Sequence, residues 1–386
     1  MPKSFDRVID RRNSDSIKWN LYDNDVLPMW VADMDFASPV PVIQALQNRI
    51  EHGVFGYAGD PTALRKVIVE RFDEKYHWTI CPEDIVFTPG VVVGFNIAAH
   101  SISMPNGEIL IQPPVYPPFF KTGSYAGLKT VENALIQDET GRYGIDFQDF
   151  ENKVTDNTRM FLLCNPHNPV GRVFKREELE QMAEICLRKN VLICSDEIHG
   201  DLIFPGHQHL PIASINPDIA MKSITLMAPS KTFNIAGLDC SFAVIPNKEI
   251  REQYLKAMKG ITGNTNMLGI TAALAAYQNG NPWLEDLLVY LQENRDFLKR
   301  TLDREMPLIR MNPPEGTYLA WLDCRQLGLS ENPYDFFLKK ARIAFNSGDA
   351  FGTGGKGFVR MNFGCTKALL NEALERMKTA LENISA

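Results

Sequence analysis

Residues 226–242, "LMAPSKTFNIAGLDCSF", place a single lysine directly after a run of mostly apolar residues. The run from Ser223 to Ala228 predicts a buried strand, and Lys231 stands just beyond its end. A lysine in such a place is usually a surface or helix-end charge. Beside a core strand, however, its desolvation is costly unless the amine is paired, neutral or covalently occupied. Lys231 is therefore a candidate for chemistry at a strand end.

Other short apolar runs, each ended by polar or proline-containing sequence, occur on both sides of this lysine. Amphipathic stretches such as "KREELEQMAEICLRKN" (175–190) separate several of them. This alternation predicts an α/β fold with a mainly parallel sheet, in which ligands bind at the carboxyl ends of the strands. The predicted strands are "EILIQPP" (108–114), "MFLLCNP" (160–166), "VLICSDE" (191–197), "SITLMAPS" (223–230) and "CSFAVIP" (240–246).

Polar side chains stand at three of these strand ends. Asn168 lies just beyond one strand, Asp196 ends the next, and Lys231 follows a third. Taken singly, Asp196 is as well explained as a helix cap or half of an ion pair, and "CNPHNPVG" around Asn168 as two tight turns. The three together favour a common site.

The rest of the chain predicts a second, smaller domain. A long helical region over 281–303 is followed by candidate strands near 317–323 and 357–363, which suggests an α+β unit. Near the other end, "ASPVPVIQALQNRIEHG" predicts a helix with Ser38 as its N-cap and a stop at Gly53.

Composition excludes several classes of function. The 386 residues carry a formal charge of −7 without a basic block, which argues against a nucleic-acid partner. No apolar stretch approaches a membrane span and no secretory leader is recognisable, so we expect no membrane contact and a cytoplasmic location. The seven scattered cysteines are expected to be small core residues in a reducing compartment.

Two motifs are set aside. "GTGGKG" (352–357) differs from a phosphate loop at two positions, Ala350 and Gly357, and we interpret it as a mobile loop. "HQH" (207–209) lacks a third ligand at zinc-site spacing, so we expect a solvated loop there and no metal site.

The strand-end residues suit pyridoxal 5′-phosphate (PLP). This aldehyde cofactor needs a lysine for a Schiff base, an acidic side chain to keep its ring nitrogen protonated, and donors for its phosphate. Lys231 and Asp196 meet the first two needs. "TPGVVVGFNIAAH" (88–100) meets the third, because the turn at Gly90 leads into a helix whose free amides suit a phosphate. A lysine freed during turnover would be the natural base at the substrate Cα.

Seven stretches resemble the fold-type I PLP enzymes and, within them, the MalY/PatB-type C–S lyases (cystathionine β-lyase-like). They are "PMWVADMDFASP", "FGYAGDP", "PPVYPPFF", "CNPHNPVGR", "CSDEIHGDL", "APSKTFNIAGL" and "VRMNFG". The resemblance runs over almost the whole chain. It implies the aspartate aminotransferase fold, with a seven-stranded-type sheet in the large domain. The implied boundaries are an N-terminal segment at 1–45 that packs with the small domain, a large domain at 46–282 and a small domain at 283–386.

The resemblance also implies roles for single residues. Lys231 would form the Schiff base, Asp196 would hold the pyridine nitrogen, and Tyr116 would stack on the ring and take part in catalysis. Arg360 would bind the substrate α-carboxylate, where a planar bidentate donor is better than a lysine. Tyr57 would reach the phosphate of the neighbouring subunit, which implies a homodimer with shared active sites. The other implied contacts are Asn168 (ring O3′ and substrate), Gly90, Val91, Val92 and Ser230 (phosphate), and Val31 and Ala32 (substrate). From the residues alone, Arg360 could instead be an edge-strand charge, and Tyr57 and Tyr116 core aromatics.

Two positions depart from the wider aminotransferase pattern. Asp239 stands where many relatives carry a phosphate-binding arginine. His199 stands where a tyrosine often contacts O3′, so we count it among the cofactor residues with either a structural or a catalytic hydrogen bond.

These observations favour α,β-elimination from cystathionine or a related cysteine S-conjugate, giving a thiol, pyruvate and ammonia. An aminotransferase would use the same residues and remains an alternative. A PLP-binding regulator that acts through a protein partner is a second alternative, of a different class.

Overall fold

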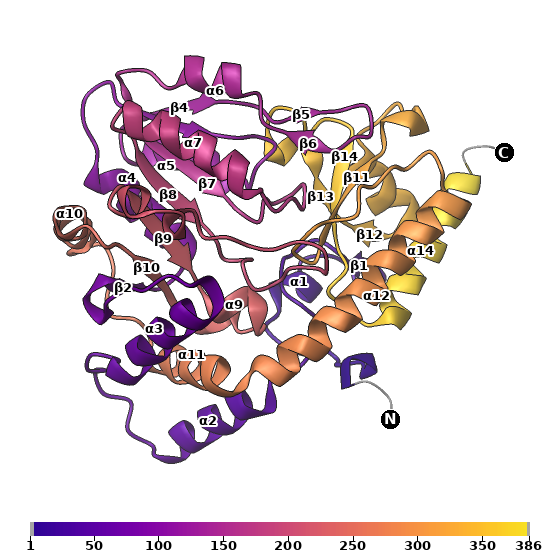
Figure 1. Ribbon diagram of the computed structural model, residues 1–386. Helices are drawn as coiled ribbons and strands as arrows, with labels where there is room; N and C mark the ends of the chain where they lie inside the picture. Colours follow the sequence, from indigo (N-terminus) through magenta and orange to yellow (C-terminus); the bar gives the residue numbers. More distant parts are fainter. Residues whose placement is uncertain (1–3, 384–386) are drawn as a thin grey trace.

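Seven strands form one sheet in the order β2-β10-β9-β8-β7-β3-β4 in the computed structural model, which describes residues 4–383 (Figure 1). All neighbours in this sheet run parallel except the two pairs that β10 forms, with β2 and with β9. The prediction of an α/β fold with a mainly parallel seven-stranded sheet is confirmed. The strands are β2 (Ile85–Thr88), β3 (Glu108–Ile111), β4 (Lys129–Glu132), β7 (Thr158–Cys164), β8 (Leu192–Asp196), β9 (Ser223–Met227) and β10 (Ser241–Val244).

Both faces of this sheet are buried, which explains why its strands are nearly continuous apolar runs. In β7, Leu162 packs into the cluster that includes Phe95 of α4 (Val91–Ser101), whereas Phe161 and Leu163 pack into the cluster that includes Leu179 of α7 (Arg176–Arg188). Side chains along a strand alternate between the two faces. Two helical layers therefore enclose the sheet.

The remaining helices complete these layers and connect the strands. α2 and α3 pack against α11 on the side of β2 and β10. Their bounds are α2 (Val40–Glu51), α3 (Thr62–Tyr76), α5 (Pro118–Tyr125), α6 (Phe147–Lys153), α8 (Pro217–Ala220), α9 (Pro229–Thr232), α10 (Lys248–Met258) and α11 (Met267–Asn279). Two short strands, β5 (Ile136–Gln137) and β6 (Tyr143–Gly144), form an antiparallel hairpin.

A smaller α+β unit follows the long helix α12 (Asn281–Glu305), drawn in orange in Figure 1. It contains an antiparallel sheet in the order β11 (Leu319–Asp323), β14 (Phe358–Asn362) and β13 (Asn346–Ser347), with α13 (Pro333–Phe336) and α14 (Lys367–Glu382). The N-terminal part, which includes α1 (Ile17–Asn20), adds β1 (Leu27–Pro28) in parallel to β12 (Ile343–Ala344). The exact boundaries at residues 45 and 282 stay a prediction.

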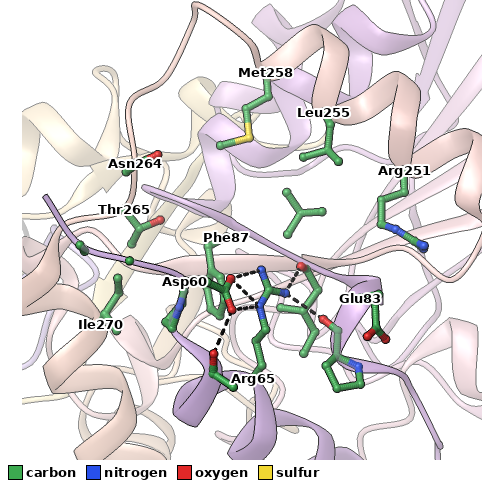
Figure 2. A pocket seen from close by; sticks show the side chains of 17 residues that line it. Asp60, Arg65, Glu83, Phe87, Arg251, Leu255, Met258, Asn264, Thr265 and Ile270 are labelled. Carbon is green, nitrogen blue, oxygen red and sulfur yellow. Dashed lines mark hydrogen bonds and ion pairs between the residues drawn. The ribbon is translucent and has the colours of Figure 1, made fainter.

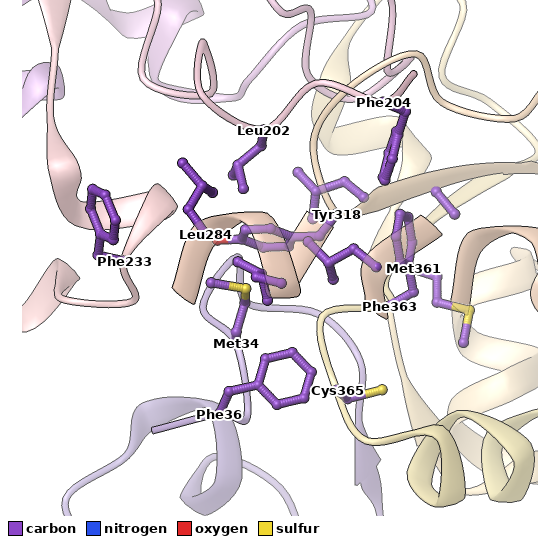
Figure 3. Close-up of a cluster of buried hydrophobic side chains, with 14 of the residues drawn as sticks. Met34, Phe36, Leu202, Phe204, Phe233, Leu284, Tyr318, Met361, Phe363 and Cys365 are labelled. Atoms are coloured by element: carbon purple, nitrogen blue, oxygen red, sulfur yellow. The ribbon is translucent and has the colours of Figure 1, made fainter. Parts of the chain in front are cut away.

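An apolar cluster joins the two units. Figure 3 shows Phe233 and Leu202 of the large unit near Leu284, Tyr318 and Met361, together with Met34 and Phe36 of the N-terminal segment. All of these side chains are buried. Burial at about 25 cal/mol per Å² makes such a contact strongly stabilising, so the three segments are held together around it.

Two local predictions are wrong. Ser38 does not cap α2, because the N-cap is Pro39 and the Ser38 hydroxyl donates to the Asn234 carbonyl instead. The "HQH" loop is solvated only in part, because His209 is buried and its Nε2 lies 2.8 Å from a Glu197 carboxylate oxygen.

Within residues 4–383, no helix combines the length and apolar character needed to cross a bilayer.

Candidate active site

The carboxyl ends of three parallel strands bring the first candidate residues together. Asp196 is the last residue of β8, Lys231 lies in α9 just after β9, and Asn168 follows the end of β7. β7, β8 and β9 are direct neighbours, so these ends share one edge of the sheet. The Asp196 carboxylate and the Lys231 amine are close enough to influence each other's pKa.

Asp196 is a buried carboxylate with little compensation from the protein. Its Oδ1 accepts a hydrogen bond of 3.1 Å from the Ile198 amide. Burial raises the pKa of Asp196 to about 7, although the Ile198 amide and the Lys231 amine work in the opposite direction. A cationic N–H brought next to this carboxylate would stabilise its charged form.

The amine of Lys231 holds its proton less tightly than the amine of an ordinary lysine. Burial, helped by the Arg360 guanidinium, lowers the pKa of Lys231 to about 8. Its Nζ donates a hydrogen bond of 2.7 Å to the Ala32 carbonyl. A lysine whose pKa lies closer to neutral pH is suited to exchange protons and to act as a nucleophile.

Arg360 reaches the same site from the small unit. β14 lies between β11 and β13, so the alternative that Arg360 is an edge-strand charge is wrong. Its Nη1 donates to Asn168 Oδ1 at 2.9 Å, and its Nη2 donates to Asn346 Oδ1 at 2.6 Å and to the Trp30 carbonyl at 3.0 Å. These acceptors are neutral, and burial lowers the pKa of Arg360 to about 10. Such a guanidinium is suited to bind an anion.

The segment after Trp30 closes the site. The Val31 carbonyl accepts from Asn362 Nδ2, and the Ala32 carbonyl accepts from Lys231 and from the Tyr318 hydroxyl. Val31 and Ala32, predicted from the resemblance to contact substrate, therefore lie next to Lys231 and the small unit.

The segment predicted to bind the cofactor phosphate has the expected geometry at the start of a helix. Gly90 is the N-cap of α4, which begins at Val91, and the first amides of a helix have no partner within it. Ser230 lies in α9 directly before Lys231. Asp239 is exposed, with a φ of +50° at the end of a short turn. An acidic side chain in this place offers no donor to a phosphate.

Two aromatic candidates lie in contrasting environments. Tyr116 is partly buried between β3 and α5, where burial raises its pKa and the Arg360 guanidinium lowers it. Tyr57 is fully exposed, with a relative accessibility of 102%, so the alternative that it is a core aromatic is wrong.

His199 is buried beside the site and neutral. Burial, followed by the charges of Lys231 and Arg360, lowers the pKa of His199 to about 3. Among the described residues, its Nδ1 has no hydrogen-bond partner. A buried ring nitrogen without a partner can accept or donate one hydrogen bond to a ligand.

Sequence reasoning missed Asn346 and Tyr318. Each contacts a predicted site residue or its acceptor, yet each comes from a segment without a recognisable motif. Tyr318 lies within the predicted strand at 317–323, whereas no sequence signal marked Asn346.

These residues fit PLP. The buried Asp196 carboxylate, which accepts from the Ile198 amide, matches a protonated pyridine nitrogen, and the lowered pKa of Lys231 matches an amine that reacts with an aldehyde. The unpartnered His199 Nδ1 adds a buried polar atom that a polar cofactor would satisfy.

A separate pocket of about 650 Å³ lies beside the edge strand β2. Figure 2 shows Arg65 and Asp60 on one side of it and Leu255 and Met258 on the other. Arg65 donates to Asp60 and lies over the Phe87 ring, 5.0 Å from its centroid. None of the predicted cofactor residues lines this pocket.

Comparison with known proteins gives consistent matches over nearly the whole chain. The family model for aminotransferase class I and II matches residues 20–377. Cystathionine beta-lyase PatB of Bacillus subtilis is 39% identical, over 98% of this chain and 100% of the relative. The PLP-bound C–S lyase from Staphylococcus hominis is 34% identical with a TM-score of 0.93, over 98% of each chain. A PLP-bound putative aminotransferase from Clostridium difficile is 40% identical with a TM-score of 0.95, over 98% of this chain and 99% of that one.

Proposed function

This chain belongs to the class I and II aminotransferase family, and we propose that it is a PLP-dependent C–S β-lyase. The substrate would be cystathionine or a related cysteine S-conjugate, and the products a thiol, pyruvate and ammonia. The observation that carries the proposal is the convergence of Lys231, Asp196, Asn168 and Arg360 on one strand edge, in a chain that resembles a cystathionine β-lyase over its full length.

The cofactor and the protein residues would have separate roles. When bound, PLP withdraws electrons from the substrate Cα, so that the Cα proton becomes acidic and a group on Cβ can leave. Asp196 would hold the ring nitrogen, and Gly90, Val91, Val92 and Ser230 the phosphate.

The chain's own groups would orient the substrate and move its proton. Arg360 would bind the α-carboxylate through Nη1 and Nη2, with Asn168 beside it. Lys231 would take the Cα proton, since burial lowers the pKa of its amine to about 8. A thiolate is a good leaving group, so orientation and charge stabilisation are the main demands. Tyr116 and His199 would contact the cofactor ring.

An aminotransferase is the second candidate, favoured by the Clostridium difficile structure described as a putative aminotransferase. It would use the same residues and differ in where the proton returns. The test is to measure pyruvate and thiol release from L-cystathionine against keto-acid exchange with added amino acceptors. Release of pyruvate without an acceptor supports the lyase, whereas acceptor-dependent exchange alone contradicts it.

Lys231→Ala is the control for this test. We expect this variant to lose both activities and the visible absorption band of the bound cofactor. A Lys231→Ala protein that borohydride still links covalently to PLP at the active site would contradict the assignment of Lys231.

We propose further that the chain forms a homodimer with shared sites. The support is a set of exposed apolar side chains at the molecular surface, Val54, Phe55, Tyr57, Leu255 and Ile261, of which Leu255 also lines the pocket at β2. Solvent-exposed aromatic and aliphatic groups of this kind are typical of interaction surfaces. Tyr57 would extend from this surface to the phosphate of the second subunit.

Hybrid dimers test the shared site. Mixing Tyr57→Phe with Lys231→Ala subunits should restore sites that carry both wild-type residues, and therefore part of the activity. No recovery, with subunit exchange verified, would contradict the proposal.

The seven cysteines form no disulfide and six of them are buried, which supports a cytoplasmic location as part of the same proposal.

A further inference from the structure

The Ala32 carbonyl is the acceptor for two buried donors. Lys231 Nζ donates to it at 2.7 Å and the Tyr318 hydroxyl at 2.8 Å. A carbonyl oxygen has two lone pairs, so these two donors use its full capacity. The Tyr318 hydroxyl therefore acts on the same atom that holds the amine of Lys231.

The peptide that carries this carbonyl is fixed on both sides. Asn362 Nδ2 donates to the Val31 carbonyl and to the Asp33 carbonyl, at 2.5 Å and 2.6 Å. Arg360 Nη2 donates to the Trp30 carbonyl. Because 30–33 has little regular strand pairing of its own, these side chains define where the Ala32 oxygen points.

Tyr318 itself is immobilised by packing. Its side chain has no exposed surface, and Figure 3 shows its ring among Met34, Leu202 and Met361. Burial raises its pKa, so the hydroxyl stays protonated and donates over the whole working pH range. The backbone next to it is also constrained, since Thr317 has a φ of +70°.

We propose that Tyr318 is a positioning residue for Lys231, acting through the Ala32 carbonyl. A free lysine amine that donates one N–H to a fixed carbonyl has a defined direction for its lone pair, away from that carbonyl. Without the Tyr318 hydroxyl, the Ala32 oxygen keeps a vacant lone pair and the amine gains a second orientation. The inference rests on the proposed function, in which the Lys231 amine removes the Cα proton.

The test compares Tyr318→Phe with Tyr254→Phe. Tyr254 is a matched control, because it is also fully buried and its hydroxyl also donates to a backbone carbonyl, that of Gly94, at 3.1 Å. Both variants lose one buried hydrogen bond and should lose similar, small amounts of stability. Only Tyr318→Phe should change the behaviour of Lys231.

The first readout is exchange of the Cα proton of L-alanine with deuterated solvent, which isolates the proton step because no group leaves from Cβ. Per cofactor-loaded site, Tyr318→Phe should exchange about tenfold more slowly or worse, with KM within about twofold of wild type. Tyr254→Phe should exchange at the wild-type rate. Equal rates for Tyr318→Phe and wild type would overturn the proposal.

The second readout does not depend on the lyase reaction. PLP is added to cofactor-free protein, and its covalent capture by Lys231 is followed by visible absorbance. Tyr318→Phe should capture several-fold more slowly than Tyr254→Phe. If wild type shows neither exchange nor elimination but capture still slows in Tyr318→Phe, the proposed function fails and the positioning role stands. Equal capture rates would count against the positioning role.

Discussion

Asp201 follows Asp196 closely in the chain, and both carboxylates are largely buried, but their partners differ. Asp201 accepts from Arg71 at 2.7 Å, from Lys75, and from the Thr232 hydroxyl at 3.2 Å. Burial alone would raise its pKa, but Arg71 and Lys75 outweigh that effect and lower it well below the ordinary value. Asp196 has an amide donor, and burial raises its pKa to about 7.

The arginines of the two regions differ in the same way. Arg71 is paired with Asp201, whose charge outweighs burial and raises the pKa of Arg71. Among the described residues, the acceptors of Arg360 are neutral oxygens, and burial lowers its pKa. In one region the charges neutralise each other and hold α3 against the loop after β8. In the active-site region, the charges of Asp196 and Arg360 remain free to bind a ligand. Burial by itself therefore does not mark a functional charge, whereas burial without an opposite charge at hydrogen-bond distance does.

The largest effect should come from Asp201→Asn. Removing one partner of a buried ion pair leaves Arg71 and Lys75 uncompensated, so the free energy of unfolding should fall by about 3 kcal/mol or more. Denaturant unfolding measures this loss. Turnover per cofactor-loaded site should stay within about tenfold of wild type. A variant that keeps full stability would remove the contrast between the two aspartates.

Asp196→Asn should give the opposite result. The amide cannot hold a protonated pyridine nitrogen, so turnover per loaded site should fall roughly a hundredfold or more, about 3 kcal/mol in the barrier. Cofactor binding should persist, and stability should be unchanged or higher, because a poorly compensated charge is removed. Titration of loaded sites by visible absorbance separates turnover from folding. Near-wild-type turnover per site would contradict the role of Asp196.

A smaller effect should follow from Arg360→Lys. The lysine keeps the charge but loses the planar pair of donors, so KM for the amino-acid substrate should rise roughly tenfold to a hundredfold. The corresponding change in the paired region, Arg71→Lys, should leave KM unchanged. Steady-state kinetics on both variants tests the difference. An equal KM for Arg360→Lys and wild type would mean that the α-carboxylate binds elsewhere.

A further effect should be a pH dependence of stability in the cofactor-free protein. The pKa of Asp196 is raised from 3.8 to about 7 on folding, so folded protein binds more protons between these values and stability falls as pH rises from about 4 to 7. The pKa of Asp201 is lowered, so its contribution is present above about pH 4 and lost on further acidification.

Asp196→Asn and Asp201→Asn should each remove one of these two pH dependences of stability. Unfolding free energies of Asp196→Asn should be flatter than wild type between pH 4 and 7, and those of Asp201→Asn flatter below pH 4. Identical pH profiles for wild type and Asp196→Asn would show that the Asp196 carboxyl is already compensated.

Much of the central sheet could be predicted from the sequence, because strands buried on both faces are apolar throughout. β2 and β4 were missed: "KTVE" in β4 has one apolar residue in four, and the short run "IVFT" of β2 was not singled out. The antiparallel direction of β10 has no local signal, because direction depends on the path of the chain between strands.

The strand-end residues of the site could be predicted, whereas their contacts with the small unit could not. Lys231, Asp196 and Asn168 follow apolar runs that set their place. The partners Asn346, Tyr318 and Ala32 come from segments far apart in sequence, and two of the contacts use a backbone carbonyl, which no residue type reveals. The burial of His209 was missed for a similar reason, because its contact with the buried carboxylate of Glu197, directly after β8, depends on how the loop folds back.

The place of β10 between β2 and β9 has a consequence for synthesis on the ribosome. In the sheet formed by the described residues, β2 is an edge strand and pairs with β10. β10 emerges roughly 150 residues after β2, which at about 5–20 residues per second is a delay on the order of ten to thirty seconds. During that time the apolar β2 has no partner strand in the nascent chain, and an unpaired strand edge is prone to wrong pairing. A chaperone that binds nascent chains should therefore be found on 85–88 until translation passes residue 244.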